Sequence, residues 1–256
     1  MNKKNISFFL NNKQVQANEN ESIWQVAKRL GVEIPHLCYS DEKGYRADGN
    51  CRACMVEIEG ERVLAASCIR HPSENMKVFT ASDRAKKSRE LVFELLLTDQ
   101  PKKEEAHDPE SHFWKWIDEV EVKDSRFPKK TSCKSDISHP SMAVNLDACI
   151  QCNLCVRACR EVQVNDVIGM AYRGENSKIV FDFDDPMGDS SCVACGECVQ
   201  ACPTGALMPS SVMDEKGIGY TKVENKIKSV CPYCGVGCQL EYNINNNKIA
   251  YVNGID

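Results

Sequence analysis

Cysteine is the side chain in this sequence most able to carry chemistry. The chain has 256 residues and 16 cysteines, and all of them except Cys133 fall into four ordered groups. Thiolates bind zinc and iron–sulfur clusters, and the number and spacing of the ligands distinguish the two kinds of site. The sequence therefore predicts a series of metal sites, each organising a small domain with a limited hydrophobic core of its own.

The first group has the spacing C-x12-C-x2-C-x13-C and consists of Cys38, Cys51, Cys54 and Cys68. A two-iron cluster needs four thiolates, and Gly44 and Gly49 lie in a loop that must fold closely around it. Zinc is the alternative, because C-x2-C pairs are common zinc knuckles, but the two outer cysteines lack that spacing. We therefore expect an iron–sulfur cluster here, and the resemblance described below implies that it is [2Fe–2S].

The second and third groups repeat the pattern C-x2-C-x2-C-x3-C, which is typical of bacterial two-cluster ferredoxins. In that pattern the fourth cysteine of each motif points away from its own motif and serves the neighbouring cluster. The spacing predicts one [4Fe–4S] cluster on Cys149, Cys152, Cys155 and Cys202, and a second on Cys192, Cys195, Cys198 and Cys159. Zinc on these thiolates is the alternative, and the two matching motifs favour iron–sulfur cubanes.

The last group is the segment CPYCGVGC, with Cys231, Cys234 and Cys238. Gly235 and Gly237 permit the backbone to approach closely between the ligands. A cubane needs four ligands and the sequence supplies three, so we expect a third [4Fe–4S] cluster here only if the chain extends further. A zinc knuckle, which also lacks a fourth ligand, is the alternative.

Short strands and one helix must position the first group. The alternation of apolar and polar residues predicts a hairpin over 6–10 and 14–16, a helix over 21–30, and strands over 55–59, 62–66 and 76–80. These elements make a small α+β domain. Trp24 is expected in its core.

A second helix is predicted over 83–97, with a capping box that joins Thr80 to Asp83. The polar, proline-punctuated segment 98–134 follows it, and Phe113, Trp114 and Trp116 predict a docking helix within that segment. His107, His112 and Cys133 also lie there, without a chelating spacing. Strands are expected over 178–183, 239–244 and 248–252.

Composition limits the partners. The formal net charge is −5 and the basic residues are dispersed, so we expect no nucleic acid partner. The apolar run Ile6–Leu10 is too short for a secretory leader, and Glu94 interrupts the longer run Leu91–Leu97, so we expect no insertion into a membrane. Reduced thiols then indicate a cytoplasmic protein.

These motifs resemble known electron-transfer subunits. The first cysteine group resembles the [2Fe–2S] β-grasp domain of complex I, formate dehydrogenase and NAD-reducing hydrogenase subunits. The segment CPYCGVGC resembles the first domain of molybdopterin oxidoreductases, especially formate dehydrogenases. In order, the motifs resemble the N-terminal region of the α subunit of cytoplasmic NAD-dependent formate dehydrogenase. The chain departs from these subunits after His107, where the motif H-x3-C-x2-C-x5-C of a further cluster is absent.

The resemblance implies an α+β architecture of four parts. These are a β-grasp [2Fe–2S] domain (1–80), a helical linker (81–140), a two-[4Fe–4S] ferredoxin domain (141–215) and the start of a molybdopterin oxidoreductase Fe4S4 domain (224–256). It further implies formate oxidation at a bis-molybdopterin molybdenum or tungsten centre in a catalytic domain outside this chain. Electrons would then pass to flavin and NAD-binding diaphorase-type subunits, and no residue of this chain would be catalytic.

Three alternatives remain at this point. The first is an iron–sulfur subunit of complex I or of an NAD-reducing hydrogenase, although the CPYCGVGC segment and the absent histidine motif argue against both. A stand-alone ferredoxin-like carrier is the second alternative. A zinc-organised interaction protein without redox function is the third.

Overall fold

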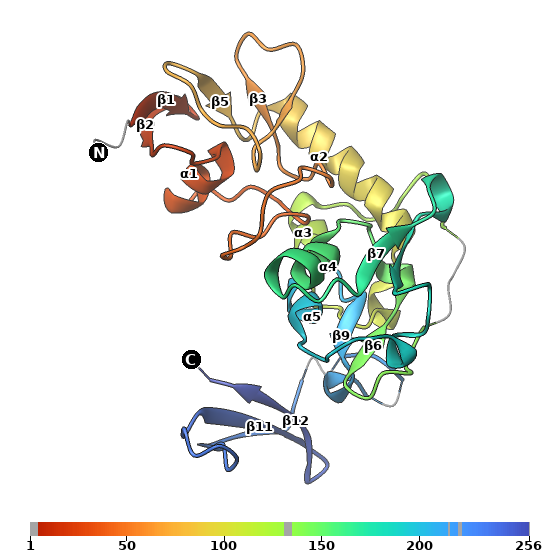
Figure 1. Cartoon of the computed structure of the whole chain (residues 1–256). Coiled ribbons are helices and arrows are strands. Elements are labelled where there is room, and N and C mark those ends of the chain that lie inside the picture. Colours follow the sequence, from red (N-terminus) through yellow and green to blue (C-terminus); the bar gives the residue numbers. More distant parts are fainter. Residues whose placement is uncertain (1–4, 131–134, 215, 220–221, 256) are drawn as a thin grey trace.

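The computed structural model describes residues 5–130, 135–214, 216–219 and 222–255. Figure 1 shows a first lobe at the N-terminal end of the chain, a second lobe that follows it in the sequence, and a C-terminal sheet beside the second lobe. Helix α2 (Asp83–Leu96) runs from the first lobe toward the second. The predicted mixture of helices and short strands, in this order, is confirmed.

The first lobe is a five-stranded sheet with the order β2-β1-β5-β3-β4 and a helix, α1 (Ile23–Arg29), packed on it. The strands are β1 (Ile6–Leu10), β2 (Lys13–Ala17), β3 (Met55–Ile58), β4 (Ala65–Ala66) and β5 (Lys77–Phe79). Strands β1 and β5 are parallel and the other pairs are antiparallel. The core of the lobe includes Phe8, Trp24 and Val56, all buried, so the expectation for Trp24 is confirmed.

The ends of the two predicted helices differ from the sequence prediction. Ser22 caps α1 and forms a capping box with Gln25. Ser82, whose hydroxyl accepts from the Ala85 amide, caps α2, so the predicted capping box from Thr80 is wrong. The Thr80 hydroxyl instead accepts from the Asn11 side chain at 2.8 Å. This contact joins residues that are far apart in the sequence, so the residues around Thr80 alone do not predict it.

Helix α3 (His112–Val120) packs the linker onto both lobes. It buries Phe113, Trp114 and Ile117, which confirms the predicted docking helix. These side chains share one hydrophobic cluster with residues of the first lobe, the linker and the second lobe, namely Leu37, Cys38, Ala53, Phe93, Ala106, Ile150, Cys152 and Leu154. The linker is therefore structural, because it supplies the common core of the two lobes.

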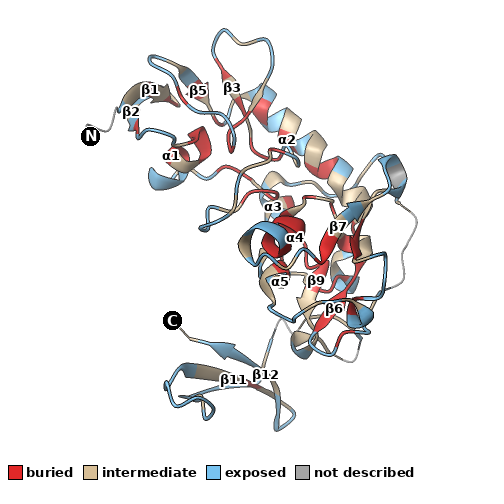
Figure 2. Cartoon of the chain, in the orientation of Figure 1, coloured by how far each residue is buried: buried red, intermediate tan, exposed pale blue. Residues whose placement is uncertain are grey.

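The second lobe is built around two short helices, α4 (Leu154–Arg157) and α5 (Glu197–Ala201). A π-helical turn, η4 (Ala158–Val162), continues α4. Two antiparallel strand pairs flank the helices: β6 (Met142–Val144) with β9 (Leu207–Pro209), and β7 (Ile168–Ala171) with β8 (Lys178–Phe181). The buried residues are concentrated in α4, β6 and β8, and Figure 2 shows the buried colour in α4 and β6.

The C-terminal sheet is antiparallel, with the order β10-β11-β12. Its strands are β10 (Asn225–Val230), β11 (Gln239–Asn245) and β12 (Lys248–Gly254). Figure 2 shows it as mostly exposed, and Asn243 is the buried residue within these strands. None of the helices in the described ranges is both long and apolar enough to cross a bilayer.

Candidate iron–sulfur centres

The four cysteines of the first group lie close together at the base of the first lobe. Cys38, Cys54 and Cys68 are buried and Cys51 is half-buried. The Cys38 amide lies 3.4 Å from the Cys51 sulfur and the Cys51 amide 3.4 Å from the Cys38 sulfur. Amide hydrogens directed at sulfur stabilise thiolate charge, so the geometry of this loop suits negatively charged sulfur atoms.

The thiols of this group compete for their protons. Hydrogen bonds from Cys51 and Cys68 lower the pKa of the Cys38 thiol to about 2. A hydrogen bond from Cys68 lowers the pKa of Cys54 to about 7. Contact with the Cys38 thiolate raises the pKa of Cys51 and that of Cys68. All four sulfurs ionise together only if a cation compensates them, which fits an iron cluster.

Backbone geometry explains why the loop of the first group contains glycine. Gly49 has φ +64°, and a Cβ at this position would lie 2.9 Å from Ile69 Cδ1. Gly44 has φ +99°, and a Cβ there would lie 3.4 Å from Val162 of the second lobe. The loop thus passes close to the cysteine site on one side and to the second lobe on the other.

One cavity of the second lobe is lined by four cysteine side chains, namely Cys149, Cys152, Cys155 and Cys202. Ile150, Ile179 and Leu207 supply its apolar wall. Burial raises the pKa of the Cys149 thiol to about 11 and raises that of Cys152 and Cys155 as well. Three cysteines of the first ferredoxin motif and the last cysteine of the second motif therefore share one dry site, the arrangement that a cubane with crossed ligands requires.

The remaining cysteines of the two motifs form a second group around Cys198. Burial, followed by the charges of the nearby Cys192, Cys195 and Cys159, raises the pKa of the Cys198 thiol to about 12. The Val167 amide donates to the Cys159 sulfur at 3.3 Å. Cys159 lies in the turn η4, and this turn carries it away from its own motif.

The two motifs share an unusual backbone conformation beside their second cysteines. Gln151 and Asn153, on either side of Cys152, have φ +55° and +62°; Ala194 and Gly196, on either side of Cys195, have φ +57° and +77°. Left-handed conformations are costly for residues other than glycine and persist only where the surrounding structure imposes them. Both loops are therefore folded in the same way, as the sequence repeat predicts.

The last group lies on the loop between β10 and β11. Cys231 is half-buried, whereas Cys234 and Cys238 are exposed. The Cys231 amide donates to the Cys238 carbonyl at 2.8 Å, and Gly235 and Gly237 have φ +76° and +83°. The loop is closed, and two of its three cysteines are exposed, whereas Cys195 is the exposed cysteine among the three other groups.

Other residues of the linker occupy the positions at which the absent cluster motif would have its cysteines. Counted from His107, the spacing H-x3-C-x2-C-x5-C falls on Ser111, Trp114 and Val120. His107 Nδ1, Ser111 Oγ and Trp114 Nε1 are buried without a hydrogen-bond partner among the described atoms. Counting from the histidine would have shown this correspondence in the sequence. Cys133 lies outside the described residues.

His107 and His112 do not lie in a common site, since His107 is buried and His112 is exposed. Among the side chains that the structure describes, no three of His, Cys, Asp or Glu converge as a single metal ion would require. His36 and His71, the other two histidines near the first group, contact Trp24 and the Glu21 carbonyl respectively.

Arg157 is a functional candidate that sequence reasoning missed. It lies on α4 between two cysteines of the first ferredoxin motif, and its exposed fraction is 2%. Its guanidinium contacts the backbone of Cys38 in the first lobe and of Cys152 in the second. Its burial depends on partners in the first lobe that are far away in the sequence, whereas Arg160, which follows Cys159, is exposed.

Three family models match the chain. A 2Fe-2S iron-sulfur cluster binding domain matches residues 3–83, a 4Fe-4S dicluster domain matches 148–206, and a molybdopterin oxidoreductase Fe4S4 domain matches 224–256. The order of the three domains agrees with the order predicted from the cysteine groups.

Several curated proteins are similar over most of this chain. The HndD component of an NADP-reducing hydrogenase from Solidesulfovibrio fructosivorans is 33% identical over 210 residues, which are 79% of this chain and 36% of that protein. A component of the NADH-quinone oxidoreductase of Rhizobium meliloti is 32% identical over 240 residues, 92% of this chain and 27% of that protein. A Staphylococcus haemolyticus protein named as a formate dehydrogenase is 26% identical over 267 residues, 86% of this chain and 26% of that protein.

The fold is also found in a solved structure. The crystal structure of an NAD+-reducing [NiFe]-hydrogenase in the H2-reduced state contains a chain that superposes with a TM-score of 0.72 at 24% identity, covering 85% of this chain and 90% of that one. This chain spans a much smaller share of the curated relatives, 36% and 27% of the first two. The chain thus consists of a 2Fe-2S cluster binding domain, a 4Fe-4S dicluster domain and the start of a molybdopterin oxidoreductase Fe4S4 domain, and it is related to the large iron–sulfur subunit of complex I.

Proposed function

We propose that this chain is an iron–sulfur electron relay. One [2Fe–2S] cluster is held by the first cysteine group, and the two [4Fe–4S] clusters are held by the crossed sets built on Cys152 and Cys195. Such clusters supply one-electron transfer, and the chain supplies the ligands, the burial and the amide hydrogen bonds that set their potentials. The observation that carries the proposal is the cavity lined by cysteines of both ferredoxin motifs.

The metal content tests this proposal. Protein produced without oxygen is expected to contain roughly ten irons per chain, two plus four plus four, from the ligand count. Its visible absorption is expected to bleach when dithionite is added. An iron content near two, or stoichiometric zinc in a colourless protein, would contradict the relay.

We further propose that the relay belongs to a molybdopterin-dependent formate dehydrogenase, in which electrons from formate leave toward flavin and NAD-binding subunits. The match of residues 224–256 to the molybdopterin oxidoreductase Fe4S4 domain, directly after the dicluster domain, supports this assignment. The catalytic centre is expected in a domain that follows this segment, and residues 1–256 alone are expected to be inactive toward formate.

A longer chain that continues into a molybdopterin domain tests the assignment. Formate-dependent reduction of a viologen dye is expected from the longer chain and not from residues 1–256. The longer chain is also expected to gain one stable four-iron cluster, because it adds the missing fourth ligand to Cys231, Cys234 and Cys238. Formate oxidation by the shorter chain would refute the assignment.

A hydrogenase or quinone-linked relay is the second candidate. The similarity to components of a hydrogenase and of an NADH-quinone oxidoreductase, over most of this chain, favours it. The purified complex separates the two candidates: formate would reduce the clusters of a formate dehydrogenase complex, and hydrogen those of a hydrogenase complex. A quinone-linked complex would respond to neither donor and would pass electrons from NADH to a quinone.

A further inference from the structure

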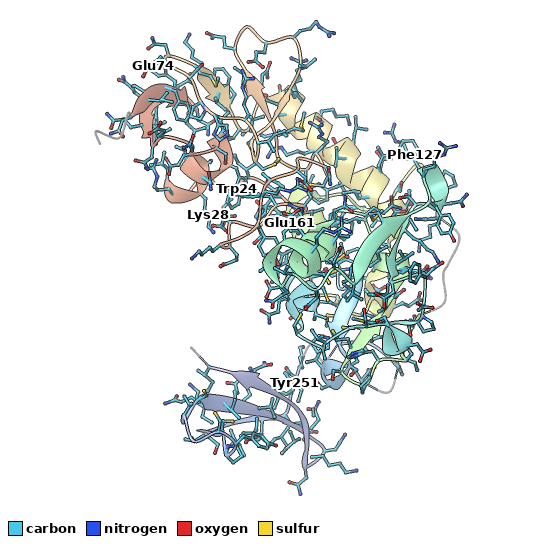
Figure 3. All side chains as sticks on the ribbon, in the orientation of Figure 1. Trp24, Lys28, Glu74, Phe127, Glu161 and Tyr251 are labelled. Carbon is cyan, nitrogen blue, oxygen red and sulfur yellow. The ribbon has the colours of Figure 1, made fainter. Side chains whose placement is uncertain are left out.

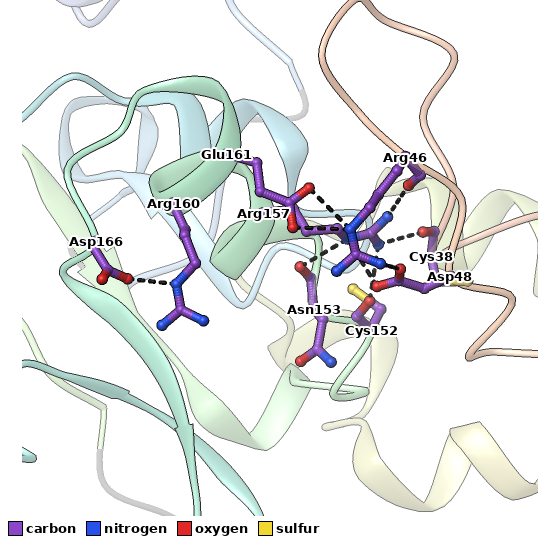
Figure 4. A network of polar contacts seen from close by, with 9 residues as sticks. All are labelled: Cys38, Arg46, Asp48, Cys152, Asn153, Arg157, Arg160, Glu161 and Asp166. Atoms are coloured by element: carbon purple, nitrogen blue, oxygen red, sulfur yellow. Dashed lines mark hydrogen bonds and ion pairs between the residues drawn. The ribbon is translucent and has the colours of Figure 1, made fainter.

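Arg157 is a buried cation where the two lobes meet. Figure 4 shows its guanidinium reaching from α4 into the loop of the first cysteine group. Its Nε lies 3.3 Å from the Asn153 carbonyl and pairs with Asp48 Oδ2 at 3.2 Å, and its Nη1 donates to the Arg46 carbonyl. A buried guanidinium is stable only when paired and hydrogen-bonded, and these contacts satisfy it on all sides.

One nitrogen of Arg157 joins the two cluster sites. Nη2 donates to the Cys38 carbonyl at 2.6 Å and to the Cys152 carbonyl at 3.3 Å. Cys38 belongs to the proposed [2Fe–2S] site and Cys152 to the first proposed [4Fe–4S] site. A chain of covalent bonds and two hydrogen bonds through a single atom therefore connects a ligand of one site with a ligand of the other.

Arg157 also belongs to a network of ion pairs. The Asp48 side chain, 12% exposed, pairs with Arg157 and with the exposed Arg46, and Arg46 pairs with Glu161 at 3.0 Å. Arg157 is thus the desolvated charge of the network, whereas Glu161, labelled in Figure 3, keeps 29% of its side chain exposed. Electrostatic interactions are stronger for the buried member because less solvent screens it.

Neighbouring contacts hold the same interface. The Tyr45 hydroxyl donates to Glu197 Oε1 at 2.9 Å, and burial, followed by this carboxylate, raises the pKa of Tyr45. Gly44 approaches the Val162 side chain. The loop of the first lobe is therefore fixed to α5 and η4 on either side of Arg157, so the guanidinium bridges two rigid elements.

We propose that Arg157 is the positioning residue for electron transfer between the [2Fe–2S] site and the first [4Fe–4S] site. It fixes the two sites against each other, provides the bonded route between Cys38 and Cys152, and stabilises the reduced state of both by its positive charge. One electron leaves one site as one enters the other, and no proton moves because a guanidinium stays protonated. The proposal rests on the relay function and is independent of the choice of formate as substrate.

Substitutions of Arg157 and Asp48 distinguish the effect of the positive charge from the effect of the hydrogen bonds that join the Cys38 and Cys152 carbonyls. Arg157→Gln removes both, so the midpoint potentials of the two clusters are expected to fall and transfer between them to slow. Arg157→Lys keeps the charge but lacks the planar fork that reaches two carbonyls, so the potentials are expected to stay near those of the wild type while transfer slows. Asp48→Asn removes the compensating carboxylate, so the potentials are expected to rise.

The measurement is a redox titration of the whole chain followed by electron paramagnetic resonance, with flash photoreduction for the transfer rate. Arg126→Gln is the matched control, because Arg126 also pairs with a carboxylate, that of Glu94 at 2.7 Å, but lies in the linker. The control is expected to match the wild type in both readouts.

Two outcomes overturn the proposal. Wild-type potentials and rates in both Arg157 variants would show that the residue is only structural. If the Arg157 variants lose their clusters, Asp48→Asn provides the test. Midpoint potentials that stay unchanged or fall in this variant would overturn the proposal, because the proposal expects them to rise. Failure of the relay itself is recognised separately, by the absence of both cluster signals from the wild-type protein.

Discussion

The cysteine sulfurs of this chain differ in their surroundings more than in their spacing. In the first group, the backbone nitrogens of Cys38 and Cys51 lie 3.4 Å from each other's sulfur, whereas Cys152 and Cys155 lie in an apolar cavity and Cys234 and Cys238 are exposed. Hydrogen bonds to sulfur and burial set the potential of a cluster. The sites are therefore expected to differ in potential even where the motifs repeat.

Crossed ligation is testable residue by residue. Cys159→Ala is expected to perturb the same paramagnetic signal as Cys195→Ala, because both belong to the site around Cys198. Cys202→Ala is expected to match Cys152→Ala instead. Signals that follow each motif separately would show that the crossed assignment is wrong.

His107 predicts how stability depends on pH. Burial lowers the pKa of His107 below 6.5, so at mildly acidic pH the unfolded chain binds a proton that the folded chain does not. The stability is therefore complete above the unfolded value and falls as the pH drops from 6.5 toward the folded pKa. Thermal unfolding at pH 7.5 and 5.5 should show this loss.

His107→Asn is expected to reduce that difference between the two pH values. His71→Asn is the control, since His71 is exposed on the first lobe, and it should retain the wild-type difference. An equal pH dependence in all three proteins would contradict the role of His107.

At the scale of elements, the linker and the second lobe meet without space for extra atoms. The Phe113 amide donates to the Pro203 carbonyl at 2.9 Å, and the Gly219 amide donates to the His107 carbonyl at 2.6 Å. A Cβ at Gly205 would lie 2.5 Å from Asp108 Cβ. The segment that follows Cys202 is thus packed directly against the linker.

Gly205→Ala is expected to destabilise the chain by about 2 kcal/mol or more, because it combines a left-handed conformation with a steric clash. Gly60→Ala is the matched control: Gly60 has φ +82° against +72° at Gly205, but nothing lies within 4 Å of its Cβ position. Chemical denaturation of the two variants measures the difference. Equal losses would show that backbone strain alone accounts for the effect.

At the scale of the molecule, the two lobes share a core. Leu37, Cys38 and Ala53 of the first lobe pack with Phe93 and Phe113 of the linker. The first lobe also has a core of its own. Its fold is therefore expected to form alone, but with an apolar face uncovered beside the first cysteine group.

A shortened chain of residues 1–80 tests this dependence. It is expected to be less stable than the same lobe in the whole chain, by roughly 2 kcal/mol for each large apolar side chain that loses its cover. It is also expected to bind a hydrophobic dye and to lose its [2Fe–2S] cluster faster in air. Equal stability and equal cluster lifetime would show that the shared core is unimportant.

The sequence by itself determined the kinds of site and their order. Cysteine spacing is a local property, because two or three residues between ligands fix how a loop can wrap a metal group, and glycine at positions such as Gly49 supports such loops. The hairpin of the first lobe, α1, β11 and β12 followed from local periodicity in the same way, and the aromatic residues Phe113, Trp114 and Trp116 indicated α3.

Only the tertiary structure decided how these parts meet. Thr80 contacts Asn11 instead of capping α2, and Arg157 lies between Cys38 and Cys152, because side chains far apart in the sequence compete for the same buried partners. Such contacts depend on the packing of whole elements, which residue spacing does not encode. The sequence therefore predicts which residues bind iron, and the packing of the two lobes sets how close the sites lie and what joins them.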